Sequence, residues 1–202
     1  MYLSDIQIDY LKEIINIGVG RSANVLNKVV KNRVSLQVPI VQIIKVGEIN
    51  KRIGCTNENT LSIVSMNFQG KLKGKAELIF PSTSAVKIVD LLTDKVYPNL
   101  EMDDLRSSSL NEVGNIVLSA LIGSIGNILK IRFKYSIPKY KECQSSEIIN
   151  NYESESDYVI FAETHFHIKD NNIDGSFILF FVVKSFEHFI DLLNQSLNNP
   201  YA

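Results

Sequence analysis

The 202-residue sequence has no tryptophan, only two cysteines, three histidines and five prolines, and a net charge of −1. So small a net charge argues against a broad electrostatic surface for nucleic acid or for an anionic membrane. The longest purely apolar run, 177–183, has seven residues, whereas a helix needs about 20 to cross a bilayer. The first residues do not show the basic segment followed by an apolar segment that is typical of a secretion signal. We therefore expect a cytoplasmic protein in which Cys55 and Cys143 are free thiols in polar loops.

The composition, with 45% hydrophobic and 21% charged residues, is typical of a globular protein. A chain of this length buries a sufficient core without disulfides or a structural metal. We predict one domain over residues 1–202.

The same sequence pattern occurs twice, 99 positions apart, and reads (D/S)-x3-E-x2-N-x22-P. Its residues are Asp9, Glu13, Asn16 and Pro39 in the first half, and Ser108, Glu112, Asn115 and Pro138 in the second. The ends of the halves repeat as well, with GKAELIF at 74–80 and GSFILFF at 175–181. A duplicated unit explains this best, with repeat one over 4–97 and repeat two over 103–200.

Each half opens with a helical pattern of about 25 residues, which corresponds to a length of about 37 Å. Ser4 or Asp5 caps the first helix, with Ser4 and Gln7 as a capping box, and Asp103 or Asp104 caps the second. Small and large residues alternate along one face of each helix, so the two helices can approach closely. These positions are Leu11, Ile15, Gly18, Ser22, Val25 and Val29, and then Leu110, Gly114, Val117, Leu121, Ser124 and Ile128.

Three strands and a short helix follow in each half. The predicted strands are 34–46, 61–68 and 73–80, and then 131–140, 158–168 and 176–183. The closing helices are 82–93 and 185–197, and the polar segments 47–60 and 141–157 are predicted loops. Pro39 and Pro138 indicate an edge strand or a bulge.

Each unit is therefore a helix, three strands and a helix. Neither unit has enough strands to shield a core alone. We predict an α+β fold in which the two units form one pseudo-twofold symmetric domain, with the long helices packed on a β-sheet. Because one chain then contains both halves of the pseudo-dimer, a monomer is expected.

A polar stripe runs along each long helix, away from its apolar face. Glu and Asn three residues apart project from neighbouring points of the helix surface. A carboxylate can pair with a cation of another molecule, and a carboxamide can orient a water molecule. A lone Glu-x-x-Asn usually belongs to a solvated surface, but this one recurs in register together with the same proline. The pair suits a hydrolysis in which the partner supplies the electrophile.

At these residues the chain resembles the CheC-type phosphatases of bacterial chemotaxis, a family that includes CheX and FliY. Its signature is similar to the pattern above, and the segments LKEIINIGVGRSANVL and LNEVGNIVLSALIG resemble its helices. Two complete motifs match CheC better than CheX, which carries one. Arg21 departs from the family, which usually has a small or amide residue at this place.

The resemblance implies hydrolysis of the aspartyl phosphate on the response regulator CheY. Glu13 and Glu112 would form a salt bridge with the active-site lysine of the regulator. Asn16 and Asn115 would orient the water that attacks phosphorus. Because the regulator supplies Mg²⁺, no cofactor or metal site is expected in this chain.

The same resemblance implies roles for the rest of the motif and a second partner. Asp9 and Ser108 would belong to the substrate-binding surface, and Pro39 and Pro138 would have a structural role. CheC proteins also bind the receptor deamidase CheD, and the closing helix 185–197 would carry that contact.

Two other hypotheses compete with the enzyme. One is an adaptor that binds CheD or phosphorylated CheY with weak or no hydrolysis, and the other is a duplicated structural domain with merely exposed polar stripes. The adaptor predicts tight binding with little turnover. The structural domain predicts no interaction with a phosphorylated receiver domain.

Three further signals have simpler explanations. His165 and His167 alternate on a predicted strand, but no third ligand completes a metal motif. The glycines of Gly18-Val19-Gly20 and of Gly123-x-x-Gly126 lie within predicted helices, where close packing explains them better than phosphate binding. The acidic stretch 142–157 is typical of a solvated loop.

Overall fold

The structure is a computed structural model that describes residues 3–29, 33–48, 60–93, 102–144, 158–169, 173–183 and 186–198. It has the predicted α+β class. The helices are α1 (Asp5–Val29), α3 (Ser82–Thr93), α4 (Met102–Ile128) and α5 (Phe186–Asn198), with a 3-10 helix η1 (Val46–Glu48). The strands are β1 (Val34–Lys45), β2 (Thr60–Gly70), β3 (Gly74–Pro81), β4 (Phe133–Tyr135), β5 (Lys139–Gln144), β6 (Tyr158–Ile168) and β7 (Ile173–Val183).

The helices start where local signals place them, with one exception. The backbone N–H of Ser4 donates to Gln7 Oε1 at 2.8 Å and the N–H of Gln7 donates to Ser4 Oγ at 3.4 Å, so the predicted capping box is present. Helix α4 already begins at Met102. Asp103 and Asp104 therefore lie in its first turn, and the prediction that one of them is the cap was wrong.

The strands form one antiparallel sheet in the order β1-β6-β7-β3-β2-β4, with β5 also paired to β2. The first strands of the two predicted repeats lie at opposite edges of the sheet, and each is next to the second strand of the other repeat. Read from either edge, the order is therefore first, second and third strand, with the roles of the two halves exchanged. Strands of both halves share one sheet, as the predicted pseudo-twofold arrangement requires, while the repeat boundaries stay a prediction.

Both prolines lie at edge irregularities. In β1 the pairing with β6 shifts between Gln37 and Ile40, around Pro39. Pro138 lies between β4 and β5, where the backbone N–H of Ser136 donates to the carbonyl of Asn67 at 2.9 Å. The edge-or-bulge prediction is confirmed. The prediction of one continuous strand over 131–140 was wrong, because residues 136–138 are not part of the sheet. The prediction of a loop over 141–157 was wrong at its start, because its first four residues belong to β5.

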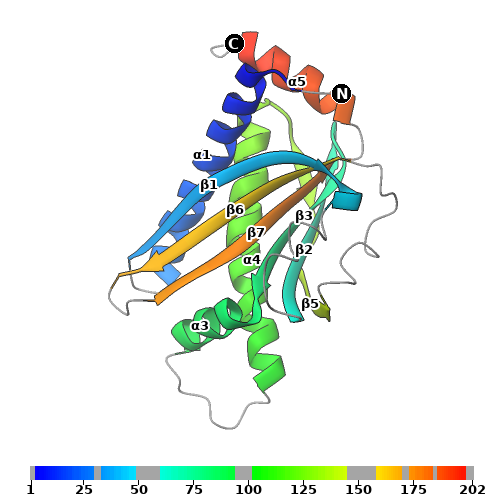
Figure 1. The fold of residues 1–202 in the computed structure, drawn as a ribbon. Coiled ribbons are helices and arrows are strands. Elements are labelled where there is room, and N and C mark those ends of the chain that lie inside the picture. The colour runs from blue at the N-terminus through cyan, green and yellow to red at the C-terminus, as the bar shows by residue number, and fades with distance from the viewer. Residues whose placement is uncertain are drawn as a thin grey trace.

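The other predicted strands and closing helices are confirmed to within a few residues at each end. Helix α5 begins at Phe186, and position 185, where the predicted helix starts, lies outside the described residues. In Figure 1, α1 and α4 run along the sheet and α3 and α5 lie near its opposite ends. No helix in the described part of the chain is long and apolar enough to span a membrane.

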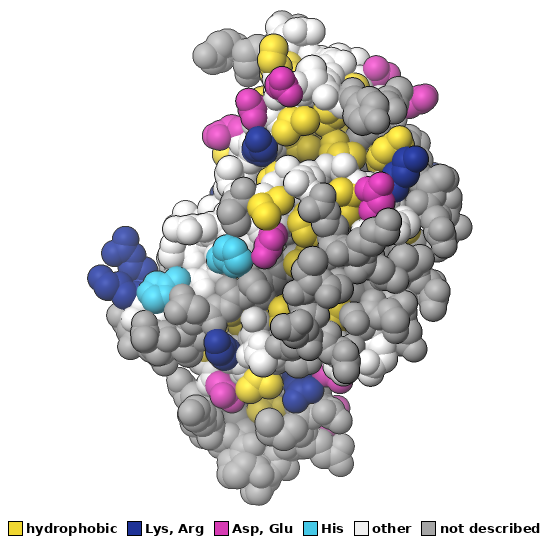
Figure 2. All heavy atoms as spheres, viewed as in Figure 1, with side chains coloured by type: hydrophobic (Ala, Val, Ile, Leu, Met, Phe, Trp, Pro, Cys, Tyr) yellow, Lys and Arg dark blue, Asp and Glu magenta, His cyan; other side chains and the backbone are white. Residues whose placement is uncertain are grey.

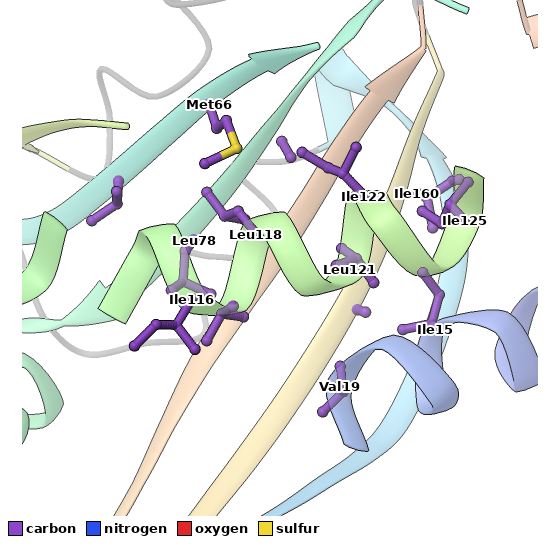
Figure 3. Close-up of a cluster of buried hydrophobic side chains, with 14 of the residues drawn as sticks. Ile15, Val19, Met66, Leu78, Ile116, Leu118, Leu121, Ile122, Ile125 and Ile160 are labelled. Atoms are coloured by element: carbon purple, nitrogen blue, oxygen red, sulfur yellow. The ribbon is translucent and has the colours of Figure 1, made fainter. Parts of the chain in front are cut away.

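The main core lies between the sheet and the two long helices. Figure 3 shows Ile15 and Val19 of α1 meeting Leu121 of α4, while Leu118 and Ile122 reach toward the sheet. The predicted apolar faces are buried except at their C-terminal ends, where Val25 and Val29 are each 42% exposed and Ile128 is half-buried. The core face of α1 instead includes Ile14, Val19 and Leu26.

The two long helices cross in a symmetric contact. A Cβ atom on Gly18 would lie 2.8 Å from Leu121 Cδ1 and 3.1 Å from its Cα. Ser22 Oγ donates to the carbonyl of Val117 at 3.3 Å. Leu121 follows Ser22 by 99 positions, and Val117 follows Gly18 by 99, so the two contacts exchange the halves as a twofold axis does. The close approach predicted from the small residues is confirmed at this crossing.

The opposite face of the sheet buries a second apolar cluster, to which eight of the described residues belong. They are Ile44, Val46, Leu61, Ile63, Ile79, Val159, Phe161 and Ile178. Glu77 is completely buried beside them, 2.5 Å from Lys75 Nζ, and accepts a hydrogen bond from Ser65 Oγ at 2.9 Å. A buried carboxylate is tolerated because both contacts compensate for its lost hydration.

Candidate functional site

Each long helix presents its Glu and Asn on an exposed face. Glu13 and Asn16 of α1 are exposed between the buried residues Leu11, Ile14 and Ile15. Burial of these neighbours fixes the rotation of the helix, so the polar pair projects outward. Cβ atoms three residues apart on a helix lie about 5–6 Å from each other. The two side chains can thus contact a single partner group together.

Helix α4 repeats this arrangement. Glu112 and Asn115 are exposed, while Leu110, Val113 and Gly114 between and before them are buried. Gly114 lies directly on the sheet, since a Cβ atom there would be 2.3 Å from Val64 Cγ1. This close contact fixes α4 against β2 at the position between Glu112 and Asn115.

The two pairs form separate sites. Nine residues separate Asp9 from Gly18 and Ser108 from Val117, which is two and a half helical turns. Each stripe therefore lies on the helix face opposite to the crossing contact. We call the surface with Glu13 and Asn16 site one and the surface with Glu112 and Asn115 site two.

The four side chains are available to another molecule. The side chains of Glu13, Asn16, Glu112 and Asn115 form no hydrogen bond or ion pair with another described residue; only the backbone carbonyl of Asn115 accepts a hydrogen bond, from Ser119 Oγ. A carboxylate next to a carboxamide offers an acceptor for a cation together with one donor and one acceptor for water. No general base of the histidine type accompanies either pair on its helix.

The flanks of the two sites differ. At site one Asp9 Oδ1 forms an ion pair with Lys12 Nζ at 3.1 Å. At site two the matching residue, Ser108, is neutral, and its Oγ donates to the carbonyl of Leu105 at 3.1 Å. Asn111 takes the place of Lys12, and its Oδ1 is buried with no hydrogen-bond partner in the described part of the chain.

Arg21, the departure from the family pattern, takes part in the helix crossing. Its Nη1 donates to Ser124 Oγ of α4 at 3.1 Å. The guanidinium thus connects the two long helices and does not prevent their close packing. A Cβ atom added to the neighbouring Gly20 would have no atom within 4 Å, and the same is true of Gly123. The close-packing explanation for these two glycines was wrong, whereas it is confirmed for Gly18 and Gly126.

A polar network near the start of α4 was not predicted. Arg106 Nη1 lies 2.8 Å from Glu142 Oε1, and Tyr140 Oη donates to the same carboxylate oxygen at 2.6 Å. Burial and the bond to Glu142 raise the pKa of Tyr140 to about 12. The hydrogen bonds from Tyr140 and Arg106 lower the pKa of Glu142, and the bond to Glu142 raises the pKa of Arg106. The network fastens β5 to α4.

The histidine and cysteine signals do not form a site in the described chain. His165 Nε2 lies 3.9 Å from Glu163 Oε1 on β6, and the described residues contain no group of three or more His, Cys, Asp or Glu side chains placed to hold a metal ion. Figure 2 shows histidine side chains on the surface, with charges of both signs interspersed around them. Cys143 is a half-buried thiol that forms no disulfide with another described residue, and it lies within β5 and not in a loop as predicted. Cys55 lies outside the described residues.

The fold and the two polar stripes define a class of protein, in which an antiparallel sheet packs against two crossing helices and each helix carries an exposed Glu/Asn pair. No protein-family model matches the chain. The curated protein CheY-P phosphatase CheC of Bacillus subtilis is 26% identical over 138 residues, which are 66% of this chain and 65% of CheC. The match thus spans just under two thirds of that relative. It confirms the predicted resemblance to the CheC-type family.

Solved structures share the fold. FliY of Thermotoga maritima superposes with a TM-score of 0.76 at 19% identity, over 98% of this chain and 97% of the FliY chain. A chain of the CheX–CheY–BeF3–Mg²⁺ complex of Borrelia burgdorferi superposes with a TM-score of 0.52 at 13% identity, over 87% of this chain and 98% of that one. At these identities the similarity concerns the fold alone.

Proposed function

We propose that this chain is a protein aspartyl-phosphate phosphatase that acts on phosphorylated CheY at two sites, Glu13 with Asn16 and Glu112 with Asn115. The observation that supports it most is the pair of exposed Glu/Asn stripes on two symmetry-related helices, whose side chains have no partner among the described residues. The similarity to a CheY-P phosphatase over most of the chain supports the same conclusion. Partner, substrate and chemistry are all part of this proposal.

In the proposed reaction, the carboxylate of Glu13 or Glu112 pairs with the active-site lysine of the regulator. The carboxamide of Asn16 or Asn115 enters the regulator's active site and orients one water molecule in line with the phosphorus–oxygen bond. A new bond forms between the water oxygen and phosphorus, and the bond from phosphorus to the aspartate oxygen breaks. Inorganic phosphate leaves with the protons of the water, and the aspartate of the regulator remains as a free carboxylate. The regulator brings the Mg²⁺ that neutralises the developing charge.

The contribution of this chain is positioning. Phosphoryl transfer requires little covalent participation from a protein and depends on alignment and electrostatics. A long helix held by buried residues on both sides of the Glu/Asn pair is a rigid support for such alignment. The contact of Gly114 with Val64 fixes the distance between the sheet and the part of α4 that carries site two.

An adaptor is the second candidate, because neither helix carries a histidine that could act with the Glu/Asn pair as a general base. It would bind phosphorylated CheY, or CheD through α5, with turnover barely above the regulator's own hydrolysis. Helix α5 buries Phe189, Leu192 and Leu193 and exposes Glu187 and His188. The CheD contact and the monomeric state are proposals too.

The test measures the loss of phosphate from phosphorylated CheY with catalytic amounts of this protein. Asn16→Ala and Asn115→Ala should each leave the activity of the other site, and the double variant should fall to the regulator's own rate. Asn24→Ala and Asn127→Ala are matched controls, because both asparagines are exposed on the same two helices. They should retain full activity.

The outcomes separate the candidates. Full activity in the double variant, or in a variant with all four Glu and Asn residues replaced by alanine, would refute the proposed sites. No acceleration by the wild type, combined with tight binding of phosphorylated CheY or CheD, would favour the adaptor. Absence of any interaction with a phosphorylated receiver domain would leave only a structural role.

A further inference from the structure

The core gives little support to the first turns of α1. None of the residues 5–10 is buried, and Ile6 is 71% exposed. Of the apolar side chains in this stretch, Tyr10 alone packs against the main core. The first buried residue of the helix is Leu11. Glu13 follows only two positions later, so site one begins where the support by the core begins.

Helix α5 supports this stretch instead. Tyr10 Oη lies 2.7 Å from Ser196 Oγ of α5, and Gln7 Nε2 donates to Asn194 Oδ1 of α5 at 2.7 Å. We call these two hydrogen bonds the α5 bridge. In Figure 1, α5 lies at the end of the molecule where α1 begins. Residues 5–10 form no other side-chain hydrogen bond with another described element.

The hydroxyl of Ser196 joins both long helices. It donates to the carbonyl of Ile128, the last residue of α4, at 2.8 Å. Because a hydroxyl has a single proton, Ser196 must accept the other bond, and Tyr10 is its donor. The carbonyl of Ile128 is one of the four at the end of a helix that lack an intrahelical partner. Ser196 thus connects the end of α4 to the start of α1.

The start of α4 is held differently. Leu105, which matches Ile6 by position, is half-buried and packs against the main core. Ser109, which matches Tyr10, is buried. The core therefore fixes the turns of α4 that precede site two, whereas α1 depends on α5 for the turns that precede site one.

We propose that Tyr10, Asn194 and Ser196 are positioning residues for site one, and that site two does not depend on them. This inference rests on the proposed function. Tyr10 lies three positions before Glu13, so the two side chains leave neighbouring points of the helix surface. A bond that holds Tyr10 therefore holds the turn that presents Glu13 to the regulator. Alignment is the contribution proposed for this chain, and a misplacement on the order of 1 Å costs up to about 100-fold in rate.

The α5 bridge has a simpler alternative role, because two hydrogen bonds between helices also stabilise the fold as a whole. A general loss of stability lowers the amount of folded protein and so lowers the activity of both sites equally. The positioning role lowers the activity of site one alone. The two roles are therefore separable by measuring each site by itself.

The experiment combines Tyr10→Phe with Asn194→Ala, which together remove both bonds of the α5 bridge. The bond from Ser196 to α4 and the capping box of α1 remain. In the Asn115→Ala background, where only site one is intact, we expect kcat/KM for phosphorylated CheY to fall by about 3- to 10-fold. In the Asn16→Ala background, where only site two is intact, it should stay within about twofold of its starting value.

Tyr135→Phe with Asn127→Ala is the matched control. Both side chains are exposed, and neither forms a hydrogen bond with another described residue. This control should change neither site. Amide hydrogen exchange of the same variants is a second measurement, which does not require hydrolysis. Without the α5 bridge, the amides of residues 9–13 should exchange faster, while those of α4 should be unchanged.

Equal losses at both sites would assign the α5 bridge to general stability and overturn the positioning role. An unchanged kcat/KM at site one would overturn it as well, even if the amides of residues 9–13 exchange faster, because α5 would then hold the helix without affecting the site. Failure of the phosphatase proposal is a different result, namely wild-type activity in the variant that lacks Asn16 and Asn115.

Discussion

The contact between Gly114 and the sheet makes a prediction that joins stability to activity. A Cβ atom at this position would lie 2.3 Å from Val64 Cγ1 and 2.8 Å from Val64 Cβ. Val64 is completely buried and β-branched, so its side chain has no other place to move. Helix α4 must therefore shift away from β2 in Gly114→Ala.

The magnitude follows from two opposing contributions. Overpacking of a closely packed core costs about 1–3 kcal/mol, and alanine in place of glycine within a helix recovers about 0.5–1 kcal/mol. We expect Gly114→Ala to lower the free energy of unfolding by about 1–2 kcal/mol. Gly123→Ala, in the same helix but with no atom within 4 Å of the new Cβ, should raise it by about 0.5–1 kcal/mol.

Urea unfolding and thermal unfolding followed by circular dichroism measure both variants. At about 2–4 °C per kcal/mol for a chain of this size, their Tm values should differ by about 3–12 °C. In the Asn16→Ala background Gly114→Ala should also lower kcat/KM, because a misplacement on the order of 1 Å costs up to about 100-fold. Equal stability of the two alanine variants would refute the close contact and with it the fixed position of site two.

Three further predictions concern the framework. The raised pKa of Tyr140 implies a contribution to stability that is complete below pH 10 and lost as the pH rises toward 12, so the difference in unfolding free energy between the wild type and Tyr140→Phe should fall over that range. A difference that is independent of pH would contradict the raised pKa of Tyr140, and with it the burial of the hydroxyl and its bond to Glu142. Ser4→Ala removes the capping oxygen of α1 and should lower the free energy of unfolding by about 1 kcal/mol in urea titrations; no change would mean that the capping box does not contribute. Lys75→Met removes the contact between Lys75 Nζ and the buried Glu77 carboxylate and should cost about 3 kcal/mol, and restored stability in the Lys75→Met, Glu77→Leu double variant would confirm the cause.

Local sequence signals predicted the elements that depend on local physics. The helix α1 begins at its capping box, and both long helices follow the spacing of their buried residues. The duplication predicted that both halves share one architecture, and the sheet order agrees with it. The exposure of the Glu/Asn pairs followed from the same helical periodicity.

Features that depend on contacts distant in sequence were missed. The break at 136–138 is stabilised by bonds between Ser136 and Asn67, two residues 69 positions apart. Glu142 pairs with Arg106, 36 positions away, so a segment that looked like solvated loop became a strand. The sequence around each of these residues gives no indication of the contact that it makes. Val25 continues the apolar period of α1, yet it is exposed. The periodicity predicts which face of the helix is apolar, but not how far along the helix the contact with the core extends.

The core and the surface of this chain have different symmetry. At the helix crossing, Gly18 with Leu121 and Ser22 with Val117 obey the exchange of halves, because buried contacts constrain both partners of each pair. Beside the two stripes the constraint is absent: Asp9 and Lys12 of site one form an ion pair, whereas the neutral residues Ser108 and Asn111 take their places at site two. Since the Glu/Asn motifs are equally complete, a difference in activity between the sites would originate in these flanks. Exchanging Asp9 and Lys12 with their counterparts Ser108 and Asn111 is therefore a more direct test of site preference than any substitution of the Glu and Asn residues.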